Sequence, residues 1–583
     1  MEPWLQGVIA VSVFLVLAMI AFIINKLWCQ DEKDSEKKDK QVSFMSGNTN
    51  ECIFSNGVEG RYSATAADFR CEEDPHVYEN KVEFECDTMT GHHTENHIND
   101  GFQCDTMTEC HTIPSQKEDL KCMLEWSEQY SYAFPRWFGI FFSSVVVSHP
   151  EYAKTLFARG DPKAEFIYAT LIPWIGKGLI TLDGTKWHQH RRLLTPAFHY
   201  NILKPYVAVI ADTTKVMLDK WEKLIAKEPM KSLEMFDHIS LMTLDSIMKC
   251  AFSHKSNCQT DRDLGYYVQA VSDLTLLSFR RITSTIFRSD FLYSYTPSGQ
   301  RFKQACELAH RHTEKVIEER KKSLRNEREL EKIQKKRHLD FLDILLCAKY
   351  EDGTGLSDED LRAEVDTFMF AGHDTTASGL SWLLYIMAKH LEHQQKCREE
   401  VKEILGDRED IQWDDLGKMT YSTMCIKESL RIYSPVPRVS RKLSKPITFF
   451  DGCTLPEDII VEVDIYSLHK NPSIWPEPFE YDPMRFSPEN ASKRHSHAFI
   501  PFAAGSSSCS PVQDNKRRPS QSAGTWDAEN NRWGRDQSEV AFLRTTQNFL
   551  YWFSTTCQNL LNTISDSHPD LIDSILCPHL LSF

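Results

Sequence analysis

An apolar run near the N-terminus is the first strong pattern along the chain. No charged residue occurs from Pro3 to Ile24, and Val8 to Ile24 is almost entirely apolar. A helix of this length, at ~1.5 Å per residue, reaches about 33 Å and can cross the hydrocarbon core of a bilayer. Basic residues follow the run and none precedes it, which disfavours a cleaved signal peptide and predicts a cytosolic C-terminal side. We therefore expect a single transmembrane anchor at residues 3–25.

The polar stretch 31–116 shows no sustained helical or strand period. We expect it to be a disordered insertion. The alternative is a site for a soft metal ion, although the spacing of its cysteines and histidines matches no known zinc motif. These residues are Cys86, His92, His93, His97, Cys104, Cys110 and His111.

From residue 118 onward the pattern becomes that of a folded domain, which we expect at 117–509, with an atypical tail at 510–583. Helical periodicity dominates, and short runs alternate like strands. Ser357, followed by three acidic residues, is typical of a helix N-terminus. The expected elements are helices at 118–130, from 150 onward, at 357–389, 393–405 and 421–433, and strands at 134–138, 144–147 and 459–465. The pattern predicts a mainly α fold with small β-sheets.

The middle of the helix expected at 357–389 carries unusual residues for an apolar helix. The side chains of Asp374 and Thr375 compete with the helix for backbone hydrogen bonds, and Gly372 leaves space beside them. A carboxylate and a hydroxyl facing such a groove could hold water or dioxygen and pass protons to it. On its own, the segment fits a kinked core helix with a satisfied threonine equally well.

Two other pairs stand at helical spacing. Trp187 and Arg191 (i, i+4) present an indole N–H and a guanidinium to one target, which suits a pair of carboxylates. Glu428 and Arg431 (i, i+3) meet on one helix face, where the ordinary interpretation of such a pair is a surface salt bridge.

Taken in order, these segments resemble the cytochrome P-450 superfamily of haem-thiolate monooxygenases. The resemblance runs from about residue 118 to about residue 505, and within the superfamily it is similar to family 4, the fatty-acid ω-hydroxylase group. It rests on Trp187–Arg192, Ala371–Thr376, Glu428–Arg431, Pro483–Phe486 and Phe502–Cys509. The expected fold is therefore the cytochrome P-450 fold with one N-terminal transmembrane helix.

The resemblance also implies roles for individual residues. It implies that Cys509 is the axial thiolate ligand of the haem iron and that Asp374 and Thr375 deliver protons. The residues implied to bind the haem propionates are Trp187, Arg191 and Arg441. A buried ionic triad with a structural role is implied for Glu428, Arg431 and Arg485. The resemblance implies haem b as cofactor and electrons from NADPH through NADPH-cytochrome P-450 reductase, with cytochrome b5 as a second partner.

The chain departs from the family pattern at two places. Family 4 members often carry a glutamate that forms an ester with the haem where this chain has Ala371, so we expect non-covalent haem. Around Cys509 the pattern asks for arginine two residues before and glycine two residues after, but Ser507 and Pro511 stand there. The helix that should follow the cysteine is replaced by a sequence without a clear period.

Composition narrows the function further. The net charge of −16 disfavours nucleic acid as a partner, and seventeen cysteines without a framework spacing indicate reduced thiols facing the cytosol. We expect a protein of the endoplasmic reticulum membrane that hydroxylates fatty acids or similar lipophilic molecules. The alternative is a haem-poor, catalytically impaired splice-type or gene-model product of the same family.

Overall fold

The computed structural model describes residues 116–138, 142–228, 233–256, 258–260, 265–284, 287, 289–325, 339–350, 353–408 and 411–504. All of them lie in one of the two units into which the chain divides, Cys110–Phe583. The expected anchor at 3–25, the polar stretch up to residue 115, Cys509 and the tail at 510–583 lie outside the described residues. Among the residues described, no helix has both the length and the apolar character that crossing a bilayer requires.

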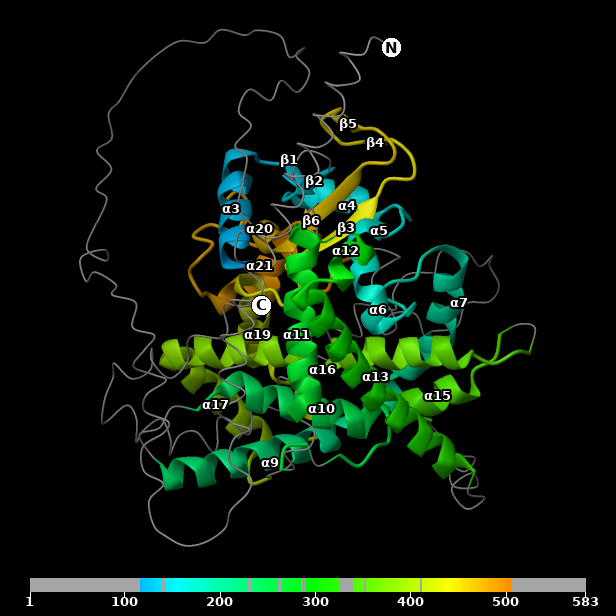
Figure 1. Ribbon diagram of the computed structural model, residues 1–583. Coiled ribbons are helices and arrows are strands. Elements are labelled where there is room, and N and C mark those ends of the chain that lie inside the picture. Colours follow the sequence, from blue (N-terminus) through cyan, green and yellow to red (C-terminus); the bar gives the residue numbers. More distant parts are fainter. Residues whose placement is uncertain are drawn as a thin grey trace, which may run out of the picture. The chain divides into compact units, whose positions relative to one another are not determined.

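Helices dominate the described part of the chain, as the sequence pattern predicts (Figure 1). The longer ones are α3 (Gln116–Gln129), α4 (Pro150–Phe157), α7 (Gly184–Leu194), α9 (Tyr206–Lys227), α10 (Met235–Ala251), α11 (Gly265–Thr283), α13 (Pro297–Leu324), α15 (Phe341–Cys347), α16 (Asp358–Lys389), α17 (Leu391–Leu405) and α19 (Thr420–Ile432). Short helices and 3-10 turns connect them: α5 (Glu165–Tyr168), η1 (Ala169–Leu171), α6 (Ile172–Ile175), η2 (Thr195–Phe198), α8 (Tyr200–Leu203), α12 (Asp290–Ser294), α18 (Trp413–Leu416), α20 (Ile465–Leu468), η4 (Pro483–Phe486) and α21 (Pro488–Lys493).

Two small sheets complete the fold. The larger has the strand order β1-β2-β6-β3, and the smaller pairs β4 with β5. Their bounds are β1 (Ala133–Phe138), β2 (Phe142–Val147), β3 (Arg438–Lys442), β4 (Ile447–Thr448), β5 (Thr454–Leu455) and β6 (Ile460–Asp464). β1 and β2 pair antiparallel, whereas β2 runs parallel to β6, so the sheet joins segments from opposite ends of the domain. Asp119 of α3 ties this sheet together, because it pairs with both Arg136 of β1 and Arg438 of β3.

Helix α16 passes through the middle of the domain with α10 alongside it (Figure 1). Its start is set by Ser357, whose hydroxyl accepts a hydrogen bond from the backbone N–H of Asp360 at 3.0 Å, as the sequence predicts. Buried residues occur on all sides of the helix, from Val365 and Met369 to Leu384, which is typical of a helix packed within the core.

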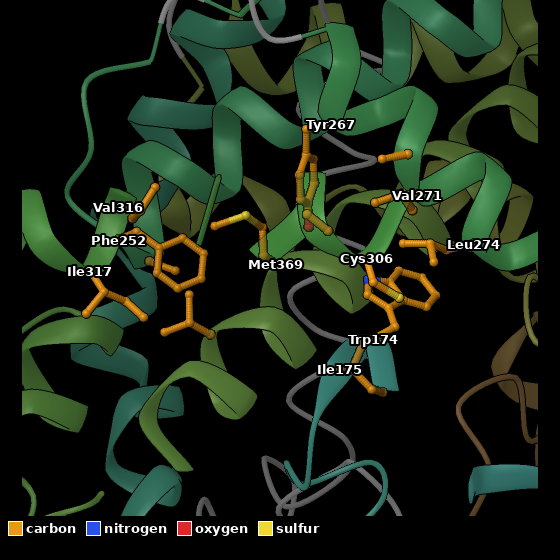
Figure 2. Close-up of a cluster of buried hydrophobic side chains, with 14 of the residues drawn as sticks. Trp174, Ile175, Phe252, Tyr267, Val271, Leu274, Cys306, Val316, Ile317 and Met369 are labelled. Carbon is orange, nitrogen blue, oxygen red and sulfur yellow. The ribbon is translucent and has the colours of Figure 1, made fainter. Parts of the chain in front are cut away.

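The largest hydrophobic core gathers around the first half of α16. Figure 2 shows part of it, with Trp174 and Ile175 of α6 near Cys306 of α13, and Tyr267 of α11 pointing toward Met369 of α16. A separate apolar cluster packs α4 against the larger sheet. The first of these clusters packs α16 against α6, α11 and α13.

Gly178 provides a test of how tightly α16 is packed. A Cβ atom there would lie 2.4 Å from Thr367 Oγ1 and 2.7 Å from the carbonyl oxygen of Ala363, both in α16. We expect Gly178→Ala to reduce the free energy of unfolding by about 1–3 kcal/mol, because the helix must shift. The matched control is Gly417→Ala, where nothing lies within 4 Å of the added atom. Urea unfolding of both variants checks this, and equal stabilities would contradict it.

Candidate functional site

The site begins with the polar residues at the middle of α16. Thr375 Oγ1 donates to the carbonyl oxygen of Ala371 at 2.7 Å, so its hydroxyl can still accept a hydrogen bond. A Cβ on Gly372 would lie only 3.0 Å from Ile247 Cδ1 of α10. Glycine therefore allows the two helices to approach, and the helix continues through the site without a break.

Asp374 is the residue of this segment with the most unusual electrostatic environment. Among the described residues, no hydrogen bond or ion pair reaches its carboxylate, and burial raises its pKa to about 7. A carboxyl group with this pKa changes between its charged and neutral forms near neutral pH, so it can both hold and release a proton there.

A second cluster unites α7, the segment before it and β3. The Arg191 guanidinium carbon and the Lys163 Nζ atom each lie 5.8 Å from the ring centre of Trp187. The backbone of Lys163 forms a bridge with Arg441 of β3. Trp187 and Arg191 therefore lie together, as their spacing predicts. Arg441, which the family resemblance implies as a third member, is linked to them through the backbone of Lys163.

Arg441 shows what this cluster can bind. Its side chain is buried, with the residue 6% exposed, and its NH1 group donates to the carbonyl oxygen of Ser440 at 2.8 Å. No carboxylate among the described residues pairs with it. A buried guanidinium is costly unless it has an anionic partner. Arg441 could therefore accept an anionic group, such as a carboxylate, as its partner.

The predicted triad residues also meet. Arg431 makes a bidentate pair with Glu428, with Nε 2.7 Å from Oε2 and NH2 2.8 Å from Oε1. Both side chains are fully buried, and Arg485 Nε lies 3.4 Å from Glu428 Oε1. The remaining N–H groups of Arg431 donate to the carbonyl oxygens of His469, Pro478 and Glu480. Glu428 and Arg431 are not a surface salt bridge but the saturated centre of a buried network.

The sequence interpretation missed a buried pair that joins α7 to α16. His190 Nδ1 lies 2.6 Å from Glu364 Oε1, and neither side chain is exposed to solvent. The backbone N–H of Leu179 donates to the other carboxylate oxygen at 3.2 Å, and the Tyr350 hydroxyl lies 3.2 Å from His190 Nε2. The signal was a glutamate on a buried helix and a histidine one turn after Trp187, but nothing local connects the two.

The chain is similar over residues 111–510 to the family described as cytochrome P-450. Over residues 1–93 it is similar to a second family, described as membrane-associated protein 117 kDa, PDZK1-interacting protein 1. This second match includes the expected anchor and most of the polar stretch. Residues 31–93 therefore resemble a family other than cytochrome P-450. The two matched ranges do not overlap.

Similarity to individual proteins agrees with the first match. The chain is 54% identical over 387 residues to cytochrome P-450 4B1 of Rattus norvegicus, covering 66% of this chain and 75% of that protein. It is 56% identical over 387 residues to cytochrome P-450 4B1 of Homo sapiens, with the same coverage. It is 54% identical over 396 residues to cytochrome P-450 4A11 of Homo sapiens, covering 68% of this chain and 75% of that protein.

The buried network predicts a large stability effect at Glu428. We expect Glu428→Gln to cost about 3–5 kcal/mol of unfolding free energy, because it leaves two guanidinium groups without their carboxylate. The same substitution at Glu318, whose i, i+4 pair with Lys322 is exposed, should cost less than about 0.5 kcal/mol. Urea unfolding distinguishes them, and a loss below about 1 kcal/mol at Glu428 would show that the network is not stabilising.

The raised pKa of Asp374 predicts a pH-dependent stability. Between about pH 4 and pH 7 the unfolded chain loses a proton that folded Asp374 retains, so its contribution destabilises the fold as pH rises. When the pH is raised from 4 to 8, the free energy of unfolding of the Asp374→Asn variant should increase by on the order of 3 kcal/mol relative to that of the unsubstituted chain. Unfolding at several pH values measures this difference. Asp414→Asn, an exposed position, is the control, and parallel curves for Asp374→Asn and the unsubstituted chain would refute the raised pKa.

Proposed function

Because the chain belongs to the cytochrome P-450 family, and within it to family 4, we propose that it is a monooxygenase that hydroxylates fatty acids or similar lipophilic molecules. The observation that carries the proposal is the buried Arg441, which has no carboxylate partner among the described residues. Its strand is bridged to Lys163, whose side chain lies over the Trp187 ring together with Arg191. The family binds haem and works with a reductase, and this cluster fits the haem carboxylates.

The haem would be haem b held without a covalent ester, since Ala371 offers no carboxylate to its edge. When bound, the haem supplies the activation of dioxygen and the oxidation of a C–H bond. Arg441, Arg191 and the Trp187 indole would hold its propionates and so set its orientation. The thiolate ligand would be Cys509, which lies within the family match at 111–510 although outside the described residues.

The residues of α16 would handle the protons that oxygen activation consumes. Asp374 can release a proton at neutral pH because burial raises its pKa to about 7. Thr375 can receive a hydrogen bond because its own hydrogen is directed to Ala371. The buried network of Glu428, Arg431 and Arg485 would hold α19 rigid against η4 and the segment before it, which is a structural role.

We also place the protein in the endoplasmic reticulum membrane, with the anchor at 3–25 and the catalytic domain in the cytosol. The match of residues 1–93 to a family described as membrane-associated supports a membrane location, although it does not name the membrane. A second support is the short helix α12 and the residue after it, where Phe291, Leu292 and Tyr295 are exposed, Phe291 by 69%. Such apolar exposure is typical of a surface that contacts lipid or another protein. The partners would be NADPH-cytochrome P-450 reductase and cytochrome b5.

A specific observation favours the second candidate, a haem-poor and catalytically impaired product of the same family. Residues 511–583 lie outside the family match, and Ser507 and Pro511 replace the arginine and glycine expected beside Cys509. Such a chain would keep the helices and the sheet but would not ligate iron through sulfur.

The carbon monoxide difference spectrum separates the two candidates. The full chain is expressed in membranes and reduced, and carbon monoxide is added. We expect a strongly red-shifted Soret band, because thiolate donates electron density to the iron. Cys509→Ser should abolish this band, whereas Cys347→Ser, at an exposed cysteine, should leave it unchanged. Absence of the band in the unsubstituted chain would support the haem-poor candidate.

A further inference from the structure

The connection between α16 and α17 gathers three potential metal ligands. α16 ends at Lys389 and α17 begins at Leu391, so His390 is the single residue between the two helices. His390, Glu392 and His393 each offer one ligand atom, and these atoms all lie within 4.8 Å of one another.

The distances place the carboxylate between the two rings. Glu392 Oε1 lies 3.4 Å from His390 Nδ1 and 3.7 Å from His393 Nε2. The ring centres are 5.8 Å apart. A metal ion at the centre of this group would replace direct histidine–carboxylate contacts with metal–ligand bonds of ~2.0–2.2 Å, which requires only small side-chain rotations.

Neighbouring residues hold both histidines in place. His393 Nδ1 lies 2.6 Å from the Tyr421 hydroxyl of α19, which leaves Nε2 for a ligand. Metal-ligating histidines are commonly oriented in this way through their second nitrogen. The His390 ring lies 5.1 Å from the ring of Tyr481, and its backbone N–H donates to the carbonyl oxygen of Ile386 at 3.0 Å.

The surroundings allow an ion to enter. The His393, His390 and Glu392 side chains are 16%, 34% and 62% exposed, respectively, so the rings are fixed by packing while the carboxylate reaches solvent. The nearby charges are mixed, because Asp482 and Lys396 both act on His393. The C-terminal end of α16 adds partial negative charge and the N-terminal end of α17 adds partial positive charge at the same place, so the two helix dipoles oppose each other. The negative charge that favours a cation therefore comes from the Glu392 carboxylate.

We propose that His390, Glu392 and His393 form a binding site for a divalent transition-metal ion of the zinc class. Two imidazoles and one carboxylate suit zinc, with water as the fourth ligand, whereas calcium and magnesium prefer oxygen ligands alone. The bound ion would fasten the end of α16 to α17, and through Tyr421 to α19. These are the helices that carry Asp374 and the Glu428–Arg431 pair, so zinc would stabilise the frame of the site. The proposal does not depend on the catalytic assignment.

Equilibrium dialysis of the full chain against zinc, without a histidine tag, tests the site. The His390→Gln and Glu392→Gln variants should each bind one zinc ion fewer per chain than the unsubstituted chain. Because the result is a difference between two chains, zinc bound at other places in both chains cancels. The matched control is His254→Gln, because His254 pairs with Glu319 at 3.2 Å but is not part of a three-ligand group among the described residues. It should retain as much zinc as the unsubstituted chain.

Thermal unfolding supplies the second readout. Zinc should raise the Tm of the unsubstituted chain and of His254→Gln but not of the two ligand variants, whose Tm without zinc and circular dichroism should be normal. Tyr421→Phe should weaken zinc binding by about 10–100-fold. Equal zinc content in the ligand variants and the unsubstituted chain would overturn the proposal, as would a calcium affinity equal to that for zinc.

Discussion

Helix α16 lies in the interior over most of its length, so the polar side chains that it carries must find partners there or change their protonation state. Glu364 finds His190 of α7, and the pair is fully buried. Thr375 is satisfied by the helix itself, through the carbonyl oxygen of Ala371. Asp374 has no such partner among the described residues, and its pKa rises to about 7. The same constraint that joins α7 to α16 therefore also leaves one carboxyl group able to exchange protons.

The clusters around Arg431 and Arg441 differ in whether the buried guanidinium already has an anionic partner. Around Arg431 every part of the guanidinium has an acceptor, including both oxygens of Glu428 and three carbonyl oxygens. Such a saturated network has no capacity for a ligand and holds α19 to the segments after it. Arg441 is also buried, but among the described residues only a neutral carbonyl oxygen accepts from it. This difference is the basis for our proposal that the second cluster binds an anionic ligand.

Much of the fold could be predicted from the sequence because its signals are local. The N-terminus of α16 at Ser357 and its end at Lys389 follow from a capping hydroxyl, early acidic residues and an apolar run. The strand pair 134–138 and 144–147 follows from alternation and proximity, and the structure pairs these segments as β1 and β2. The parallel pairing of β2 with β6 was not predicted, because it joins Ser144 to Ile460 and no local pattern encodes such a contact.

The sequence by itself determined which helices carry the candidate site and which of their residues share a face, since neighbours at i, i+3 and i, i+4 meet in any helix. This covers Trp187 with Arg191 and Glu428 with Arg431. Only the tertiary structure decided that Lys163 lies between Trp187 and Arg441, that Glu364 pairs with His190 and that Tyr421 holds His393. The physical reason is that these contacts join residues on different elements, whose approach depends on the packing of the whole core and not on any short stretch of sequence.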